Sequence, residues 1–400
     1  MNIKKKVKDI IKENIFPALW SRCLPRYQKM PEWHFYQNIN LDTLNPKQPH
    51  ILISYIMAPF LADEKAVRHT NMREALVIVR NFIQAGYAID IADCQSKFML
   101  PLLQNKRYDV IFGFGIPFMQ ACKLNPQARK VIYLTECAPD FSLSQESNRL
   151  KYYAERHGVR FPLERSGKYY QNEQIDIASE SLFMGNDYTS RAYHERFPHL
   201  KILLCPPTGM YNENFTLEHR AEEPKCGFLW FGSNGAIHKG LDILLDVFKN
   251  IPQADLYICG LSENDAVVLK AYQRYTNIHN CHFVQVDSDD YLTLIDKVSY
   301  CVLPSASEGM STSVLTCMRH GVLPVVTRST GIDVNDFGWY IEDYHVEQVE
   351  KLIRSLMHIS DAELDRRRFA VYQYANQEFS LDAYNMRIKK WIESLHVDSQ

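Results

Sequence analysis

Short apolar runs alternate along this chain with amphipathic stretches, and most runs end in a loop of small and polar residues. The first clear example is HILISYIM at residues 50–57, followed after a loop by a stretch from about 71 to 85 with apolar side chains every three or four positions. Such spacing places the apolar side chains on one face of a helix. Gly86 ends this helix, and another apolar run occupies residues 87–93. The unit predicts two parallel strands joined by a helix.

The same alternation continues through the first half of the chain. Residues 141–172, which are rich in Tyr, Arg and Glu, and residues 188–197 are predicted to be helical. The predicted strands of this half are 50–57, 87–93, 109–115, 130–135, 176–185 and 201–205. Alternating strands and helices are typical of a doubly wound parallel sheet.

A second series of strands follows a break in the pattern. Residues 206–209, PPTG, indicate a hinge, and the charged run HRAEEPK leads from it into the second half. The strands predicted there are 227–231, 255–259, 282–286, 300–303 and 322–327, and a final helix is predicted at 381–395. A chain of 400 residues is long enough for two α/β domains with separate cores.

Two loops of the second half carry the candidate chemistry. One contains Glu308 and Gly309, followed by hydroxyl residues at 311–313 that are suited to cap a helix, which stops at 319–321. A helix that opens in such a loop directs unpaired N–H groups and its positive dipole end outward, so it can hold a phosphate group.

The other loop contains Ser233, Asn234 and Gly235, and Lys239 follows it at the start of a predicted helix. A lysine there is a positive charge directed at an anion. The alternative interpretation is an ordinary exposed lysine in the first turn of a helix.

These two stretches resemble the C-terminal half of the GT-B glycosyltransferases, in particular the large retaining family with two glutamates eight residues apart (family 4-like, glycosyl transferases group 1). That family shows G-R-x-x-x-x-K-G at the start of its C-terminal domain and later P-S-x-x-E-G-x-G-x-x-x-x-E. Here FGSNGAIHKG keeps the Lys-Gly pair and a preceding glycine, and PSASEGMSTSVLT keeps Glu308.

The resemblance implies two Rossmann-like domains that face each other across a cleft. It implies an N-terminal domain at residues 1–205, with a basic amphipathic start at 1–30, and a linker at 206–224. A C-terminal domain would follow at 225–378, and a helix at 379–400 would cross back to the N-terminal domain.

The resemblance further implies a nucleotide-diphosphate sugar as donor, held by the second domain, and a saccharide or lipid-linked saccharide as acceptor, held by the first. As catalytic residues, Lys239 would stabilise the charge that builds on the departing diphosphate, and Glu308 would accept hydrogen bonds from the donor sugar. Neither a cofactor nor a metal ion would be required. The other donor-binding candidates are Gly232, Ser233, Asn234, Gly309, Met310, Ser311, Thr312 and Thr316.

The chain departs from the family pattern at two places. Ser233 or Asn234 stands where the family has arginine, and neither can form a charged bidentate pair with a phosphate. Thr316 replaces the second glutamate and offers the ribose a single uncharged hydroxyl. These departures leave open an alternative function, a catalytically inactive GT-B subunit that binds a glycan or a partner enzyme. A nucleotide-sugar epimerase fits less well, because Lys239 and Glu308 have the transferase placement.

Candidates for the acceptor side lie on loops at strand ends of the first half: His69, Asn71 and Glu136. A histidine just before a helix is more often structural than catalytic, so Glu136 is the better candidate. If the reaction retains the anomeric configuration, as the resemblance implies, the departing phosphate oxygen can take the acceptor's proton, and no dedicated base is needed.

One motif points toward a metal ion. Residues 287–290, DSDD, contain the D-x-D pattern that binds a divalent metal in the other major glycosyltransferase fold. Because an amphipathic segment follows, helix capping is the preferred interpretation.

Composition narrows the class of protein. The 45 basic and 47 acidic side chains give a net charge of −2, so charge does not point to nucleic acid. The ten cysteines are scattered without C-x-x-C pairs, and several fall in apolar runs. This pattern is typical of reduced core cysteines in a cytosolic protein.

The first 20 residues combine five lysines with several apolar side chains, but contain neither a signal-peptide pattern nor a membrane-spanning stretch. Such a segment can lie on an anionic membrane surface, or it can be a solvated helix packed on its own domain. The resulting hypothesis is a cytoplasmic, metal-independent glycosyltransferase of hexosyltransferase type, peripheral at the inner membrane face. By resemblance, it would act in bacterial surface polysaccharide biosynthesis, such as that of O-antigen or capsule.

Overall fold

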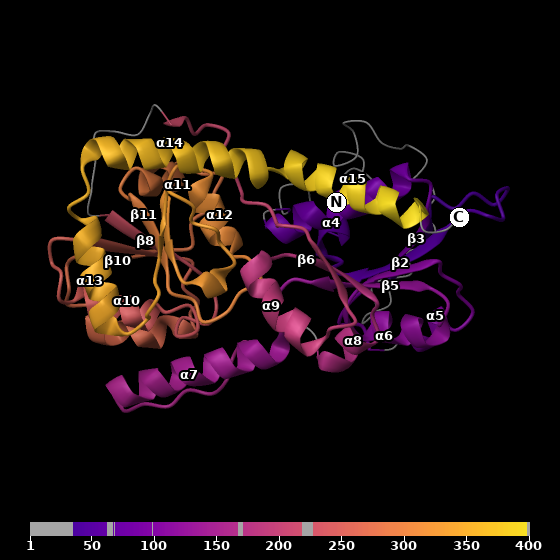
Figure 1. Cartoon of the computed structure of the whole chain (residues 1–400), viewed down its shortest axis with the longest axis horizontal. Helices are drawn as coiled ribbons and strands as arrows, with labels where there is room; N and C mark the ends of the chain where they lie inside the picture. Colours follow the sequence, from indigo (N-terminus) through magenta and orange to yellow (C-terminus); the bar gives the residue numbers. More distant parts are fainter. Residues whose placement is uncertain are drawn as a thin grey trace.

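The computed structural model describes residues 35–61, 67, 69–97, 99–166, 171–217 and 227–397. Its elements form two sheets covered by helices, and the two α/β units lie side by side (Figure 1). The predicted basic start at 1–30 and the charged run HRAEEPK at 219–225 lie outside the described residues.

Within the described residues, the first sheet has seven strands in the order β1-β3-β2-β4-β5-β6-β7. Strands β2 to β7 are parallel, and β1 pairs antiparallel to β3 at one edge. The strands are β1 (Phe35–Ile39), β2 (His50–Tyr55), β3 (Ala88–Asp93), β4 (Val110–Gly113), β5 (Arg129–Leu134), β6 (Glu180–Phe183) and β7 (Lys201–Leu204).

The second sheet is parallel throughout, with the described strands in the order β10-β9-β8-β11-β12-β13. This is the 3-2-1-4-5-6 order of a doubly wound nucleotide-binding sheet. The strands are β8 (Gly227–Phe231), β9 (Asp255–Cys259), β10 (Ile278–His282), β11 (Tyr300–Leu303), β12 (Leu323–Val326) and β13 (Trp339–Tyr340).

Helices connect the strands and cover the sheets. In the first half they are α3 (Ala58–Leu61), α4 (Thr70–Gln84), α5 (Leu100–Leu103), α6 (Gly115–Leu124), α7 (Pro139–His157), α8 (Asn172–Asp176) and α9 (Asp187–Arg196). In the second half they are α10 (Leu241–Phe248), α11 (Asp289–Ile295), α12 (Thr312–Met318), α13 (Val346–Leu356), α14 (Asp361–Glu378) and α15 (Leu381–Val397), with short 3₁₀ helices at Asp265–Tyr272 and Arg328–Thr330.

Most predicted elements lie within a few residues of the observed ones, but the strand predicted at 282–286 is wrong. Strand β10 ends at His282, where the predicted strand begins. Its sequence IHNCH is mostly polar and half-exposed because β10 is an edge strand, so it has no apolar run to reveal it. The edge strands β1 and β13 escaped prediction as well. The helix predicted at 141–172 is too long, because α7 ends at His157.

The last helix returns to the first domain, as the resemblance implies. Helices α14 and α15 run in line along one side of the molecule, from the second domain to the first (Figure 1). Trp391 of α15 lies with its ring centroid 5.6 Å from that of Phe82 and 5.0 Å from that of Phe112. These two aromatic residues belong to α4 and β4, so α15 is part of the first core.

A second crossing, which the sequence did not predict, runs in the opposite direction. Helix α7 follows β5 of the first sheet but lies along the second domain (Figure 1). Arg156, near its end, pairs with both Asp242 and Asp246 of α10. Arg149 is buried and donates to the carbonyl oxygen of Pro304 over 2.7 Å. All eight residues of α10 are buried. Helix α13 packs against α10, and Arg156 of α7 covers its two aspartates.

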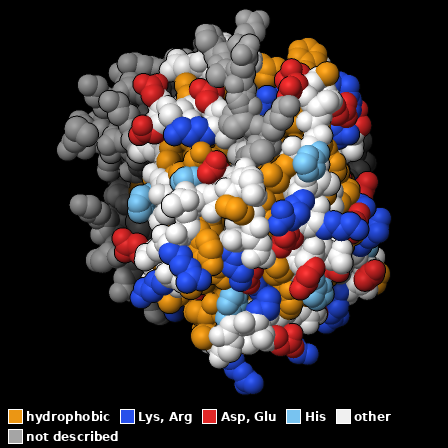
Figure 2. Space-filling view, turned by 90° about the vertical axis from the view of Figure 1, so that its left-hand side faces the viewer, with side chains coloured by type: hydrophobic (Ala, Val, Ile, Leu, Met, Phe, Trp, Pro, Cys, Tyr) orange, Lys and Arg blue, Asp and Glu red, His pale blue; other side chains and the backbone are white. Residues whose placement is uncertain are grey.

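Most charged side chains lie on the surface, and most cysteines lie in the cores. On the face of the second domain shown in Figure 2, basic and acidic side chains are interspersed. Seven of the eight cysteines in the described part of the chain are buried, which confirms them as core residues, and burial raises the pKa of thiols such as Cys94 to about 12. Cys23 and Cys226 lie outside the described residues. Each helix in the described ranges is too short or too polar to cross a bilayer.

The α7 crossing predicts a large stability effect at Arg156. Replacing Arg156 with Met leaves buried Asp242 without its ion-pair partner and removes one of the cations beside Asp246, which Lys249 also contacts. We expect the free energy of unfolding to fall by about 3 to 5 kcal/mol. Chemical denaturation followed by circular dichroism measures the change. The matched control is Arg354→Met, which removes a half-exposed pair with Glu350 and should cost less than about 1 kcal/mol. Equal effects of the two variants would contradict the conclusion that the Arg156 contacts of α7 stabilise the second domain.

Candidate active site

A cavity of about 550 Å³ lies between the two domains, at the carboxyl ends of their strands. In each sheet the strand order reverses at one point, between β2 and β4 in the first and between β8 and β11 in the second. Ligands of open α/β sheets bind outside such points. The cavity opens onto both of them, since Phe114 after β4 and Gly232 after β8 line it.

The structure brings most of the predicted site residues to this one cavity. Asn234 and Gly309 are the exceptions and do not line it. The predicted residues that line it are His69, Asn71, Glu136, Gly232, Ser233, Lys239, Glu308, Met310, Ser311, Thr312 and Thr316. The predicted residues of both domains therefore share one cavity.

Lys239 and Glu308 form an ion pair at the base of the cavity. The Lys239 Nζ lies 2.5 Å from Glu308 Oε1, and both residues are more than nine-tenths buried. Ser305 donates to the same carboxylate oxygen over 3.0 Å. Lys239 precedes α10, while Glu308 lies in the loop between β11 and α12, so two neighbouring strand-end loops supply the pair.

The carboxyl of Glu308 is held in its ionised form. Burial alone would raise its pKa, but Lys239, Arg165 and His238 together lower it to about 2. Burial lowers the pKa of His238 itself to about 4, so that imidazole is neutral near pH 7. The positive charge beside Glu308 therefore comes from the lysine and the arginine.

Arg165 is the main residue that sequence reasoning missed. It lies in the segment after α7 and lines the cavity, with its Nη2 3.4 Å from Glu136 Oε1 and 3.9 Å from Glu308 Oε2. Its Nη1 donates to the carbonyl oxygen of Asn234 over 3.5 Å. Gly235 makes room for this approach, because a Cβ there would lie 2.6 Å from the Arg165 Cδ.

The segment that carries Arg165 is fixed by a buried carboxylate. Glu146 of α7 accepts hydrogen bonds from the backbone N–H groups of Glu164, Arg165 and Ser166, and from the Ser166 hydroxyl, over 2.6 to 2.9 Å. The arginine is thus positioned before any ligand binds. The sequence contained one indirect signal for Arg165. The arginine of the family motif is absent at 233 or 234, so another residue has to supply that positive charge, but the sequence does not show which one.

The acceptor-side candidates differ in what they do in the fold. His69 is the N-cap of α4, where its Nδ1 accepts from the Asn71 backbone N–H over 3.3 Å, and burial lowers its pKa. Glu136 follows β5, and burial raises the pKa of its carboxyl despite the neighbouring Arg165. His69 and Asn71 therefore have a local structural role, whereas Glu136 presents an ionisable group between the domains.

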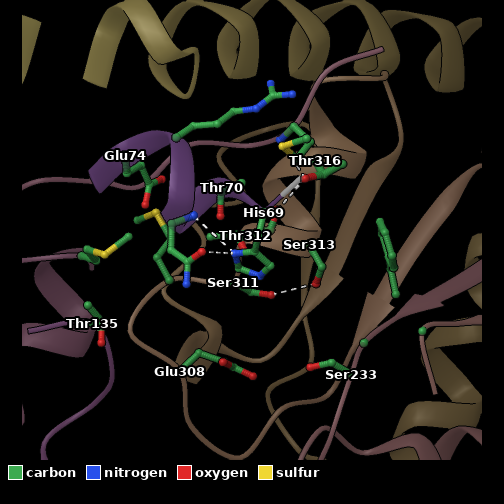
Figure 3. Close-up of a pocket in the computed structure, with 18 of the residues that line it drawn as sticks. His69, Thr70, Glu74, Thr135, Ser233, Glu308, Ser311, Thr312, Ser313 and Thr316 are labelled. Carbon is green, nitrogen blue, oxygen red and sulfur yellow. Dashed lines mark hydrogen bonds between the residues drawn. The ribbon is translucent and has the colours of Figure 1, made fainter. Parts of the chain in front are cut away.

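Thr316 is engaged within the protein. Its hydroxyl donates to the Thr312 carbonyl oxygen over 2.8 Å and accepts from the Met210 backbone N–H over 3.0 Å. The hydroxyl residues at 311–313 were predicted to cap α12, but the side-chain capping hydrogen bond is not observed. Ser311 is the N-cap of α12 without a capping hydrogen bond, and its hydroxyl lies 3.2 Å from that of Ser313 instead. Figure 3 shows both hydroxyls facing the same space.

Two glycines permit the close packing around the pair. Gly240 has a φ of +70°, and a Cβ there would lie 2.6 Å from the Pro304 carbonyl oxygen. At Gly309 a Cβ would lie 2.6 Å from the Met184 carbonyl oxygen and 2.8 Å from that of Thr135. Gly309 therefore marks the point where the second domain touches strand ends of the first.

The D-x-D run caps a helix, as preferred from the sequence. Ser288 is the N-cap of α11 and accepts from the Tyr291 backbone N–H, while Asp289 and Asp290 occupy the first turn. Within the described ranges, no three His, Cys, Asp or Glu side chains are grouped so as to hold a metal ion.

Comparison with known proteins identifies part of the chain. Residues 219–375 match the family described as "Glycosyl transferases group 1". The second domain is a group 1 glycosyl transferase domain. No curated protein is similar enough in sequence to count as a match.

Solved structures extend the likeness from the second domain to both domains. Sucrose-phosphate synthase from Thermosynechococcus elongatus is 14% identical, with a TM-score of 0.61 over 88% of this chain and 100% of that one. Anabaena HepE, solved with UDP and glucose, is 12% identical, with a TM-score of 0.54 over 87% and 100%. A pneumococcal O-GlcNAc transferase, GtfA, solved with UDP and GlcNAc, is 14% identical, with a TM-score of 0.52 over 76% and 61%. The predictions of a GT-B fold and, through the group 1 domain, of a glycosyltransferase are confirmed.

The buried pair of the group 1 domain predicts a specific pH dependence of stability. The pKa of Glu308 is about 2 in the folded protein, against an ordinary value of 4.5. Its ionisation therefore stabilises the fold by about 3 kcal/mol above pH 5, and this contribution is lost as the pH falls from about 5 to about 2.

Comparing wild type with Lys239→Met isolates that contribution. Both proteins contain the same other carboxyl groups, so the effects of those groups on stability cancel in the difference. We expect the variant to be less stable at pH 7, and the difference in unfolding free energy to shrink steadily between pH 5 and pH 3. Denaturant titrations at each pH measure it. A difference that stays constant with pH would show that Lys239 does not stabilise an ionised Glu308.

Proposed function

We propose that the protein transfers a sugar from a nucleotide-diphosphate sugar to a saccharide acceptor, with retention of the anomeric configuration. The observation that carries this proposal is the meeting of Lys239, Arg165 and Glu308 in one cavity at the switch points of two facing sheets. The structures of HepE and GtfA with UDP support the donor class, since both share this fold.

The two cations would bind the donor's diphosphate. Breaking the bond between the sugar and the diphosphate builds negative charge on the departing phosphate, and positioned cations in a water-poor cavity stabilise that charge. Lys239 supplies a point charge, and Arg165 supplies a planar guanidinium that suits phosphate oxygens. Arg165 would thus fill the place of the absent motif arginine. We propose that the protein needs no metal ion, because these side chains supply the positive charge.

Glu308 would hold the donor sugar. An ionised carboxylate only accepts hydrogen bonds, so its complement is a sugar hydroxyl. Without a ligand, Lys239 and Glu308 satisfy each other. On donor binding, a phosphate oxygen would pair with the Lys239 ammonium, and a sugar hydroxyl would donate a hydrogen bond to the Glu308 carboxylate. Each buried charge would then still have a partner.

The ribose would be held differently from the family pattern. Thr316 already uses its hydroxyl within the fold, so the hydroxyls of Ser311 and Ser313 are the better candidates for ribose contacts. Both line the cavity beside Thr312.

The proposal of retention rests on the resemblance to the retaining family, and the low basicity of Glu308 is compatible with it. A carboxylate with a pKa of about 2 is a poor acceptor for the acceptor's proton. In the proposed step the bond from the sugar C1 to the phosphate oxygen breaks, and the acceptor oxygen bonds to C1 on the same face. The acceptor's proton passes to the departing phosphate oxygen.

The donor step is tested with a panel of nucleotide sugars. We expect at least one nucleotide sugar to raise the melting temperature of the wild-type protein and to release its nucleotide when a saccharide acceptor is present. NMR of the product should show the same anomeric configuration, axial or equatorial, as in the donor. No response to any donor would favour the inactive, binding-only alternative.

Variants then test the cations. Lys239→Ala and Arg165→Gln should each weaken donor binding or turnover by about 10- to 100-fold, because each removes a charged hydrogen bond worth about 1.5 to 3 kcal/mol. The matched control is Arg160→Gln, an exposed arginine of the same segment, which should leave donor affinity within twofold. An unchanged Arg165 variant would remove this residue from the donor site.

We also propose that the protein works at the inner membrane face on a lipid-linked acceptor, in synthesis of a surface polysaccharide. The support is the resemblance and the five lysines among the first 20 residues, with apolar side chains beside them. Deletion of residues 1–20 should abolish most pelleting with vesicles that contain anionic lipid, with little effect on neutral vesicles. Equal pelleting of the two proteins would favour the alternative of a solvated first helix.

A further inference from the structure

Two buried oxygen atoms on α4 face the cavity without partners. Thr70 and Glu74 are 3% and 0% exposed, respectively, and both line the cavity. They lie four positions apart at the start of α4, so their side chains share one face of the helix. Among the described residues, no hydrogen-bond partner reaches Thr70 Oγ1 or Glu74 Oε2. Figure 3 shows both side chains projecting from this helix toward the cavity.

The other oxygen of Glu74 is fully used. Thr208, in the linker between the domains, donates both its backbone N–H and its hydroxyl to Glu74 Oε1, each over 2.7 Å. These two bonds hold the carboxyl through Oε1 and leave Oε2 without a partner. Buried polar atoms in folded proteins nearly always have a partner, because leaving one unpaired costs free energy. A pair of such atoms on one helix face therefore suggests a ligand group.

The chemistry of the two atoms indicates a hydroxyl group. Burial raises the pKa of Glu74 to about 7, even with the hydrogen bonds from Thr208 and the charge of Arg387 opposing it. The carboxyl is then present in both charge states near neutral pH. A ligand hydroxyl can donate to the ionised form and accept from the protonated form, whereas a phosphate would be repelled by the ionised form.

The location separates this pair from the donor-binding residues. Thr70 and Glu74 belong to the first domain, whereas Lys239 and Glu308 come from the second. All four line one cavity, so a group bound at α4 and a group bound at the ion pair would face each other. A neutral, hydroxyl-rich group fits the first-domain side, and an anionic group fits the cations.

We propose that Thr70 and Glu74 form a subsite for a hydroxyl group of a saccharide. Assigning that saccharide as the acceptor rests on the proposed function, but the subsite itself rests on the two unpartnered atoms. The ligand hydroxyl donates to Glu74 Oε2 and accepts from the Thr70 hydroxyl. The Thr208 contacts position Glu74 from the linker side.

The test measures saccharide binding without a donor. Methyl glucosides, galactosides and mannosides and the disaccharide lactose are titrated into the full chain by ligand-observed NMR. We expect the dissociation constant of the best ligand to rise about tenfold in Thr70→Val and at least tenfold in Glu74→Gln, since a hydrogen bond to a neutral or charged group is lost.

The matched control is another buried hydroxyl without a partner. Ser181 Oγ on β6 is buried and unpartnered in the described structure but does not line the cavity. Ser181→Ala should therefore leave saccharide affinity unchanged. If Thr70→Val and Glu74→Gln behave like Ser181→Ala, the subsite is refuted, even where the wild type turns over a nucleotide sugar.

The two proposals can fail separately. Saccharide binding that is sensitive to Thr70 and Glu74, in a protein that responds to no nucleotide sugar, would support the subsite and refute the proposed function. Failure of the whole saccharide panel to bind would refute the subsite. Thermal unfolding of each variant shows whether it is folded, and Glu74→Gln keeps an oxygen that can accept from Thr208.

Discussion

The ion pair between Lys239 and Glu308 is the constraint on which the cavity depends. Two buried charges lose their hydration, and only close geometry with further hydrogen bonds offsets that loss. Here Ser305 donates a hydrogen bond to the carboxylate, and Arg165 adds a second positive charge 3.9 Å from its other oxygen. Arg165 comes from the first half of the chain, so the balance is complete only when both halves are in place. The pair therefore couples the chemistry of the site to the packing of the domains.

That packing is maintained from two sides. Helices α14 and α15 carry the end of the chain along one side of the molecule, and α7 runs along the opposite side (Figure 1). Each crossing helix buries residues in the domain it reaches: Trp391 of α15 in the first, Tyr153 of α7 in the second. Between them, Gly309 lets the loop that bears Glu308 touch the ends of β5 and β6. The cleft is thus bounded by contacts that any opening motion would have to break.

The sequence predicted what local patterns encode. The apolar runs of β8, β9 and β11 predicted the bounds of these strands correctly. Strands β8 and β11 are buried almost throughout, as is typical inside a parallel sheet, whereas β9 alternates between half-buried and buried residues over most of its length. Lys239 and Glu308 were found because each lies in a strand-loop-helix motif. Strand β10 was misplaced because an edge strand needs no apolar run. The domain boundaries remain a prediction. Helix α7 does not fit a division of the chain into two consecutive domains, because it follows a strand of the first sheet and packs on the second domain.

Arg165 and the pair on α4 could not be predicted, for a different reason. No periodicity or motif marks Arg165, since its place depends on Glu146 holding its segment and on Gly235 leaving room for its side chain. Likewise, Thr70 and Glu74 are ordinary helix residues until the linker brings Thr208 to one carboxylate oxygen and leaves the other unpartnered. Both depend on contacts between segments far apart in the chain, which one sequence alone does not reveal.

These contacts change how the departures from the family pattern should be weighed. A diphosphate site needs positive charge at a point in space, and that charge can come from any segment that reaches the point. The absence of arginine at 233 or 234 is therefore weak evidence for lost activity when Arg165 lies against the same loop. Thr316 is a different case, because its hydroxyl joins α12 to the linker at Met210 and so serves the fold. The ribose side, rather than the diphosphate side, is where this protein should differ most from its relatives.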